Sequence, residues 1–380
     1  MMAIHEETPV DGLILAAPDW IWPGSGARST DQRFADAYRA FLAVLMDGLP
    51  ATCWFAVVTH RSAIPAMRRW LETRDHADRV RPIEVDDALR FSAWVSDVLV
   101  FCEDEDELVV VSPCQFPRAS DAELATRIAS ALDLRHVRSR LFFQGGNLLM
   151  TTDGLLVGAD DVAASVAVIP NGSRAECLHA YAMAFAGGAP VLELGAPGRV
   201  YGERDQVNAL RPGWIRRLHP GTPPAGRQPL YHIDLAVSAL PGGRLLVGDA
   251  GRAKELCPGS DPDPGVADGL DALAEGLAAA GRDVVRAPLA FLPIEDVERL
   301  RVTHIPCPSC NVIADFGSRT VFMPSATDLA PLDGLDEIDA RHVELWRGAG
   351  FSPVPIAGLE PIVRRLGGPR CLVKAVPKRT

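Results

Sequence analysis

The chain has 380 residues, 48% of them hydrophobic, and its formal net charge is −11. This length and composition are sufficient for a large buried core, as one large domain or two ordinary ones. Because the balance is acidic and the basic residues form no long run, no nucleic-acid partner is expected.

The first 85 residues alternate between helical and strand patterns. Apolar residues recur at helical spacing over 35–50 and 63–75, whereas 53–60 and 79–85 are short apolar runs typical of strands. The sequence therefore predicts helix, strand, helix, strand in this part of the chain.

Four later segments share one plan, which begins with polar residues and continues into a short apolar strand. Each then turns at an acidic or glycine-rich tip (EDED, TTDG, LPGG, DFGS) and returns as a second strand, which predicts a hairpin. We expect the EDEDE run to be a solvated hairpin tip. The four segments are 92–114, 142–161, 231–250 and 306–328.

Helix and strand patterns follow these hairpins. Residues 263–283 and 335–350 have helical spacing and end at glycine, and the strand patterns 284–291 and 351–358 come next. The unit of hairpin, helix and strand repeats about five times, with an incomplete last copy ending at RCLVKAV. Such repeats bury their apolar faces by stacking around a common axis, so we expect one α/β domain over residues 1–380.

Residues 196–225 interrupt this pattern. The segment is rich in Pro, Gly and Arg and has no clean period. A long irregular loop in a compact domain is either functional or mobile, so this one is compatible with a lid.

The candidate chemical residues occupy one position in each copy, the opening of the first strand. If the copies circle an axis, these positions meet at its centre. His232 and Asp234 are two residues apart, so on a strand both side chains would face the same side. A thiol, an imidazole and two carboxylates together would form a thiol-dependent catalytic set. The residues are Asp97, Gln144, Gly145, Gly146, Asn147, His232, Asp234, Asn311 and Cys371.

The same segments carry a resemblance to a known superfamily. WVSD, QGGN, HID and GGPRC resemble, in order and rough spacing, the W-x-R-D, E-G-G-[DN], H-[IVL]-D and G-G-x-R-C segments of guanidine-modifying (pentein) enzymes. This superfamily includes arginine deiminase, agmatine deiminase and the amidinotransferases, and APDWIWPG is more loosely similar to agmatine deiminase. The resemblance implies a five-bladed, pseudo-symmetric α/β propeller of ββαβ repeats.

The resemblance also implies an activity without metal or organic cofactor. Cys371 would attack the guanidinium carbon, His232 would act as acid and base, and Asp234 would hold the cation. Asp97, Arg370 and the turn from Gln144 to Asn147 (with Gly145 and Gly146) would bind substrate. GGPRC favours deiminase-type hydrolysis of an arginine- or agmatine-like compound. The HID and SCNVIADFGSRTVFMP segments fit an amidinotransferase as well.

Two residues depart from the superfamily pattern. Gln144 stands where a Glu is usual, so a neutral acceptor replaces a charged one, and Ser96 replaces the Arg before Asp97. Both changes weigh against plain arginine or agmatine as substrate. They leave open a third reading, a binding protein on the same fold whose reactivity has lapsed.

Some of these residues also have simpler interpretations. Asp97 could merely end a strand, Gly145 and Gly146 could serve only a turn, and Asn311 is expected to be structural. We expect Cys53, Cys102, Cys114 and Cys177 to be unreactive small apolar side chains.

A zinc-stabilised interaction module is a further alternative. His304, Cys307 and Cys310 have metal-ligand spacing, and Cys257 or water could complete the shell. Paired CxxC units are the stronger zinc signal, and the chain has no second one. A zinc site is therefore the weaker interpretation, and we expect none.

The remaining expectations concern the compartment and the partners. The sequence has no run of about 18 apolar residues, so it predicts no membrane span. The opening MMAIHEETPVDG lacks a signal-peptide pattern, and the eight cysteines form no disulfide framework. We expect a cytoplasmic enzyme whose partner is a small guanidino compound, with no membrane partner; a homo-oligomer is compatible with the sequence.

Overall fold

The computed structural model describes most of the chain. The described residues are 1–25, 32–115, 120–170, 172–195, 228, 230–262, 265–296 and 301–378, and the side chains of 294–296 and 301–303 are excepted. The segment 196–225, predicted as a possible lid, lies outside them.

The four predicted hairpins are present as antiparallel pairs. Their tips follow turn chemistry: Glu105 and Asp106 have left-handed φ angles of 52° and 68°, which is the conformation a two-residue hairpin turn requires. The pairs are β5 (Val100–Asp104) with β6 (Glu107–Ser112), β8 (Leu148–Thr151) with β9 (Gly154–Gly158), β11 (Val237–Ala239) with β12 (Leu245–Asp249), and β16 (Ile313–Asp315) with β17 (Thr320–Pro324).

A third strand lies parallel to the second strand of each hairpin. A parallel neighbour needs a crossover, and helices between the strands provide it. The third strands are β7 (Arg135–Arg138), β10 (Val191–Leu194), β13 (Val284–Pro288) and β18 (Ser352–Ile356). The crossover helices are α3 (Ala122–Ala131), α4 (Ala159–Val168), α5 (Arg174–Phe185), α7 (Ala250–Leu256), α8 (Val266–Ala279) and α9 (Leu335–Gly348).

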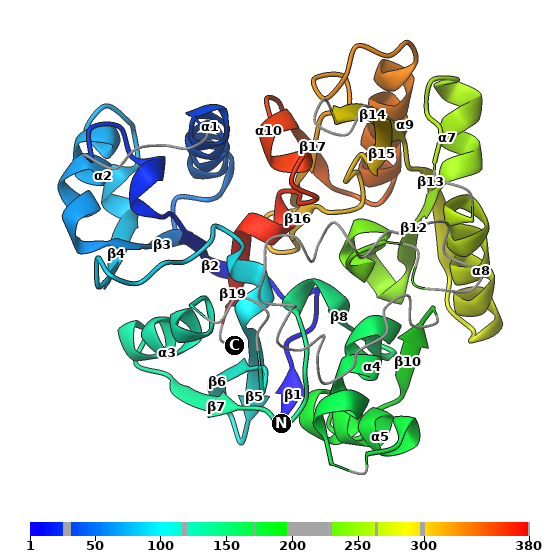
Figure 1. The fold of residues 1–380 in the computed structure, drawn as a ribbon, viewed down its shortest axis with the longest axis horizontal. Coiled ribbons are helices and arrows are strands. Elements are labelled where there is room, and N and C mark those ends of the chain that lie inside the picture. The colour runs from blue at the N-terminus through cyan, green and yellow to red at the C-terminus, as the bar shows by residue number, and fades with distance from the viewer. Residues whose placement is uncertain are drawn as a thin grey trace.

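The crossover helices bury one apolar stripe against the sheets. On α8, Leu270, Leu273 and Leu277 follow helical spacing and are buried in the same apolar cluster as Leu245 and Val247 of β12. Figure 1 shows the helices toward the outside of the molecule and the strands toward its middle.

A fifth sheet joins segments from the two ends of the described chain. Strand β19 (Val373–Pro377) is antiparallel to β2 (Val10–Ala16), which is parallel to β3 (Trp54–His60), and β3 is parallel to β4 (Val80–Val85). Helices α1 (Gln32–Gly48) and α2 (Ile64–Leu71) complete this unit. The helix, strand, helix, strand prediction for the first 85 residues is confirmed.

Four of the described elements lie outside the repeat. Strand β1 (Met2–Ala3) extends the first sheet by pairing with β5. Strands β14 (Phe291–Asp296) and β15 (Arg301–Pro306) form an additional antiparallel hairpin that the sequence did not predict. Helix α10 (Glu360–Val363) precedes the final turn and strand.

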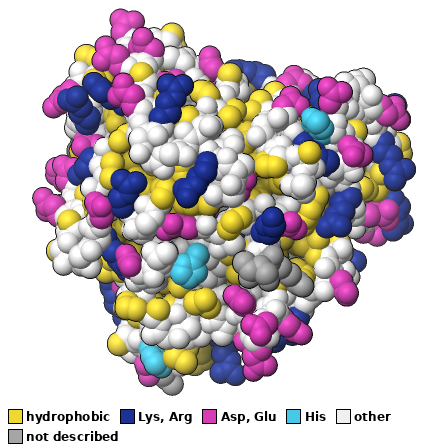
Figure 2. Space-filling model, turned by 180° about the vertical axis from the view of Figure 1, so that it is seen from behind, with side chains coloured by type: hydrophobic (Ala, Val, Ile, Leu, Met, Phe, Trp, Pro, Cys, Tyr) yellow, Lys and Arg dark blue, Asp and Glu magenta, His cyan; other side chains and the backbone are white. Residues whose placement is uncertain are grey.

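The surface is mixed in charge. On the face shown in Figure 2, acidic and basic side chains are interspersed, and no extended basic surface is visible there. None of the helices in the described part of the chain has the length and apolar character needed to cross a bilayer.

Candidate active site

Four short 3₁₀ turns in contact with one another carry the predicted residues. They are η4 (Val95–Val98), η5 (Gly145–Asn147), η7 (Ile233–Leu235) and η9 (Arg370–Leu372). The turn η4 contacts both η5 and η9, and η5 contacts η7. Each turn immediately precedes the first strand of its sheet, so the chain positions predicted to converge are brought together.

The local structure at His232 differs from the predicted strand. His232 precedes η7, Asp234 lies within it, and β11 begins only at Val237. The amide N–H of Ile233 donates to Asn147 Oδ1 at 3.0 Å, so the side chain of a neighbouring turn replaces a strand partner. The strand assignment was therefore wrong at these residues.

Two glycines allow the turns to approach. A Cβ atom on Gly145 would lie 1.9 Å from the carbonyl oxygen of Ser96, so this position is closed to any other residue. A Cβ on Gly146 would lie 2.6 Å from His232 Nδ1 and 3.0 Å from Asp234 Oδ1. The side chains of His232 and Asp234 therefore reach the same side of Gly146 despite the turn.

The imidazole of His232 is held at both nitrogens. Nε2 is 2.9 Å from Gln144 Oε1, and Nδ1 is 3.6 Å from Asp97 Oδ1. The Tyr231 hydroxyl donates to the same Gln144 oxygen at 3.4 Å. An amide oxygen accepts hydrogen bonds, so His232 Nε2 is the donor in this contact. Gln144 thus orients the ring with its other nitrogen toward the Asp97 carboxylate.

Asn311 positions the nucleophile candidate. Its Oδ1 accepts a hydrogen bond from the backbone N–H of Arg370 at 2.9 Å and lies 3.6 Å from Cys371 Sγ. A Cβ on Gly368 would lie 2.5 Å from the same oxygen, which explains a glycine there. Asn311, expected to be structural, therefore contacts the thiol directly.

The Cys371 thiol is held in its neutral form. Burial raises its pKa well above the ordinary value, and the nearby Asp234 and Asp97 carboxylates raise that pKa further. Nucleophilic attack requires the thiolate. A cation placed near this thiol would lower its pKa.

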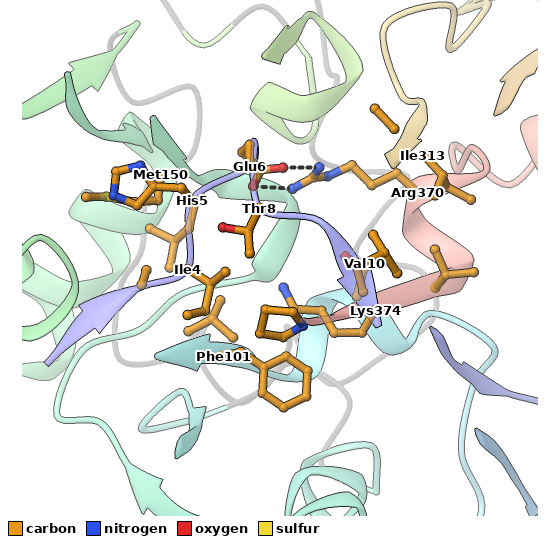
Figure 3. A pocket seen from close by; sticks show the side chains of 18 of the residues that line it. Ile4, His5, Glu6, Thr8, Val10, Phe101, Met150, Ile313, Arg370 and Lys374 are labelled. Atoms are coloured by element: carbon orange, nitrogen blue, oxygen red, sulfur yellow. Dashed lines mark hydrogen bonds and ion pairs between the residues drawn. The ribbon is translucent and has the colours of Figure 1, made fainter. Parts of the chain in front are cut away.

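Asp234 is fully buried and only partly compensated. Burial raises the pKa of its carboxyl, Arg370 lowers that pKa, and Asp97 raises it. The net result is a pKa of about 7. Arg370 Nε lies 3.4 Å from Asp234 Oδ2. The other two nitrogens of Arg370 donate to both carboxylate oxygens of Glu6, at 2.5 and 2.8 Å, as Figure 3 shows.

Asp97, His232 and Cys371 line a cavity of about 40 Å³. Such a space admits a few water molecules or a small planar group. In and around this space, the three carboxyl groups of Asp97, Asp234 and Glu6 outnumber the two guanidinium groups of Arg365 and Arg370, a balance that favours a cation. The lining residues are Trp94, Asp97, Tyr231, His232, Arg365, Leu366, Gly367 and Cys371.

Cys307 and Cys310 are buried, and the Cys307 thiol contacts the Ser309 hydroxyl at 3.3 Å. Among the residues that the structure describes, no three His, Cys, Asp or Glu side chains gather as metal ligands would, and this includes His304.

Sequence reasoning missed Glu6, Tyr231 and Arg365. Tyr231 adjoins the HID segment and could have been found by its place beside His232. Glu6 lies in an N-terminal segment without a motif, and its contact with Arg370 spans 364 positions, so no local signal identifies it.

Comparison with known proteins shows likeness in structure alone. No family model matches the sequence, and no curated protein sequence matches it significantly. Agmatine deiminase from C. jejuni aligns over 99% of this chain and 96% of its own, with a TM-score of 0.65 at 13% identity. A putative agmatine deiminase aligns over 100% of this chain and 96% of its own, with a TM-score of 0.68 at 13% identity. This chain therefore has the same fold as these two agmatine deiminase structures.

Proposed function

We propose that this protein is a cysteine-dependent enzyme that hydrolyses a guanidino compound, in the manner of a deiminase. The observation that carries the proposal is that Cys371, His232 and Asp97 line one small cavity, beside the buried Asp234. The likeness to agmatine deiminases in fold supports it. We further propose that the five sheets of three or four strands are the blades of a pseudo-symmetric propeller, and that the enzyme is cytoplasmic.

The carboxylates of Asp97 and Asp234 explain why a cationic substrate is proposed. A guanidinium is planar and donates paired N–H groups that match carboxylate oxygens. Asp97 and Asp234 would accept these bonds, and the added positive charge would offset the two carboxylates that hold the Cys371 pKa high. Substrate binding would thereby release the thiolate where it is needed.

The reaction would proceed in two stages. The Cys371 thiol passes its proton to His232 as the sulfur forms a bond to the guanidinium carbon, and the leaving ammonia departs with that proton. The resulting S-amidino intermediate is then attacked by water, which gives its proton to His232. Collapse of this adduct breaks the carbon–sulfur bond and yields a urea-type product, so that one water is consumed and one ammonia is released.

Gln144 bears on which guanidino compound is accepted. Its Oε1 is already engaged by His232 and Tyr231. A neutral amide attracts a cation less than a carboxylate does. We therefore propose that the substrate is arginine- or agmatine-like but distinct from the plain compounds.

The test is the intact-protein mass after incubation with a panel of guanidino compounds and acid quenching. A mass increase equal to the substrate less ammonia is expected for the wild type and for Cys114→Ser, a matched thiol control, and not for Cys371→Ser; an increase of amidino size alone identifies loss of the alkylamine instead. Release of ammonia and a ureido product accompanies hydrolysis, whereas a product formed only with an added amine identifies amidino transfer. The absence of both adduct and turnover with every compound would leave a binding protein and overturn the proposal.

A further inference from the structure

A second cavity lies beyond Arg370, away from the thiol. Its volume is about 100 Å³, and its walls come from the segments around β1, β5, β8, β16 and β19 (Figure 3). Arg370 borders this cavity and also contacts Asp234 in the candidate active site. The Arg370–Glu6 ion pair therefore stands between the two spaces.

Most of the wall is apolar. Ile4, Val10, Phe101, Met150 and Ile313 are among its residues. The charged wall residues Glu6 and Arg370 neutralise each other through their two-point ion pair. The uncompensated charge must therefore come from another lining residue.

Lys374 supplies that charge. Its side chain extends from β19 into the cavity, as Figure 3 shows. Within the described parts of the chain, no hydrogen bond or ion pair to its ammonium is found. Burial and the nearby Arg370 lower the pKa of Lys374, and Glu6 raises it; the net result is a pKa of about 8. A half-buried cation without a partner is costly, and an anion placed beside it would remove much of that cost.

We propose that this cavity is a second ligand site, which binds a small monocarboxylate with its charged end on Lys374 and its alkyl part against the apolar wall. One unpaired ammonium matches one carboxylate. A phosphate dianion generally needs several donors, and of the lining Lys and Arg side chains Arg370 is already paired with Glu6, which leaves Lys374. The volume suits a short chain, because a cavity of roughly 150 Å³ accommodates benzene.

This proposal is independent of the reaction at Cys371, so binding can be measured without turnover. The probe is butyrate, titrated into the full chain by calorimetry, with butyramide as its neutral counterpart and inorganic phosphate as the alternative anion. We expect butyrate to bind and butyramide to bind at least about tenfold more weakly, the factor that one charge-assisted hydrogen bond contributes.

Three variants identify the site. Lys374→Met should weaken butyrate binding about tenfold or more, and Lys374→Arg, which keeps the charge, should retain it. Lys254→Met removes a surface lysine that is paired with Asp261 and should have no effect. Folding of each variant is checked by its unfolding transition; if Lys374→Met does not fold, protection of Lys374 by butyrate against acetic anhydride, read by peptide mass in the wild type, replaces it.

Several results would overturn the assignment. These are no butyrate binding to the wild type, equal binding to Lys374→Met, equal binding of butyramide, or tighter binding of phosphate. If no adduct formed at Cys371, butyrate binding at Lys374 would be unaffected. The two proposals can therefore fail independently.

Discussion

Arg370 and Glu6 form a two-point ion pair across 364 positions of the chain, directly behind the residue proposed as nucleophile. The same guanidinium faces the buried Asp234 through Nε. One cation therefore compensates two carboxyl groups, and its loss would remove this ion-pair partner from both.

This arrangement predicts non-additive stabilities. Arg370→Met should lower the free energy of unfolding by about 2–4 kcal/mol, because it leaves Glu6 and Asp234 uncompensated. The double variant Glu6→Gln/Arg370→Met should lose less than the sum of the two single changes. Urea unfolding of Glu6→Gln, Arg370→Met and the double variant gives the free energies of unfolding. Arg341→Met, which breaks the exposed Arg341–Glu344 pair, serves as control and should cost under about 0.5 kcal/mol. Strict additivity would contradict the shared-cation interpretation.

A second prediction concerns the pH dependence of the thiol. The Asp234 carboxylate raises the pKa of Cys371, so Asp234→Asn should lower that pKa. The alkylation rate of Cys371 should then reach its plateau at a pH lower by about one unit than in the wild type. Iodoacetamide labelling across a pH series, read from the Cys371 peptide, measures this. Asp160→Asn alters a buried aspartate outside the cavity and should leave the profile in place. An unchanged profile in Asp234→Asn would mean that burial alone controls the thiol.

The close approach at Gly146 gives a third prediction. An added Cβ would push against the His232 ring and the Asp234 carboxylate. Gly146→Ala should therefore reduce kcat on the identified substrate by about 100-fold, the effect of a displacement near 1 Å. Gly276→Ala is the matched control, because α8 has open space there. It should leave kcat intact and raise stability by about 0.5–1 kcal/mol. Equal kcat in both variants would show that the turn can shift without consequence.

The fourth prediction concerns substrate range. Gln144→Glu places a carboxylate where His232 Nε2 now meets an amide oxygen. If the missing charge narrows the range, activity on arginine or agmatine should rise by about tenfold or more. Steady-state rates of ammonia release measure this, and Gln144→Met, which removes the acceptor, should lower them instead. No gain with either compound would discard this explanation of Gln144.

The repeat was predictable because its signals are local. Turn residues at the tips, apolar strands and helical spacing all lie within about 20 residues of one another, as in the β5–β6 hairpin and helix α8. The same locality explains the failure at β14 and β15. The pattern 284–291 reads as one strand, yet the chain divides it between β13 and the start of an additional hairpin.

The site was predictable as a set of chain positions and not as geometry. Equivalent positions in the copies converge, whatever the local structure, so His232 and Asp234 reach the site from a 3₁₀ turn. The turn itself depends on Asn147 accepting from Ile233, a contact between separate copies. Glu6 and the direct contact of Asn311 with Cys371 depend likewise on distant segments meeting.

The pairing of β19 with β2 also bears on when the proposed nucleophile reaches its place during synthesis. Cys371 lies two residues before a strand whose partner was made some 360 residues earlier. Contacts of such long sequence separation are slow to form, since the loop-closure entropy comes before any stabilisation. A nascent chain would therefore hold most of its repeats folded while the thiol remained unplaced. Placement of the Cys371 thiol would then mark a late step of folding.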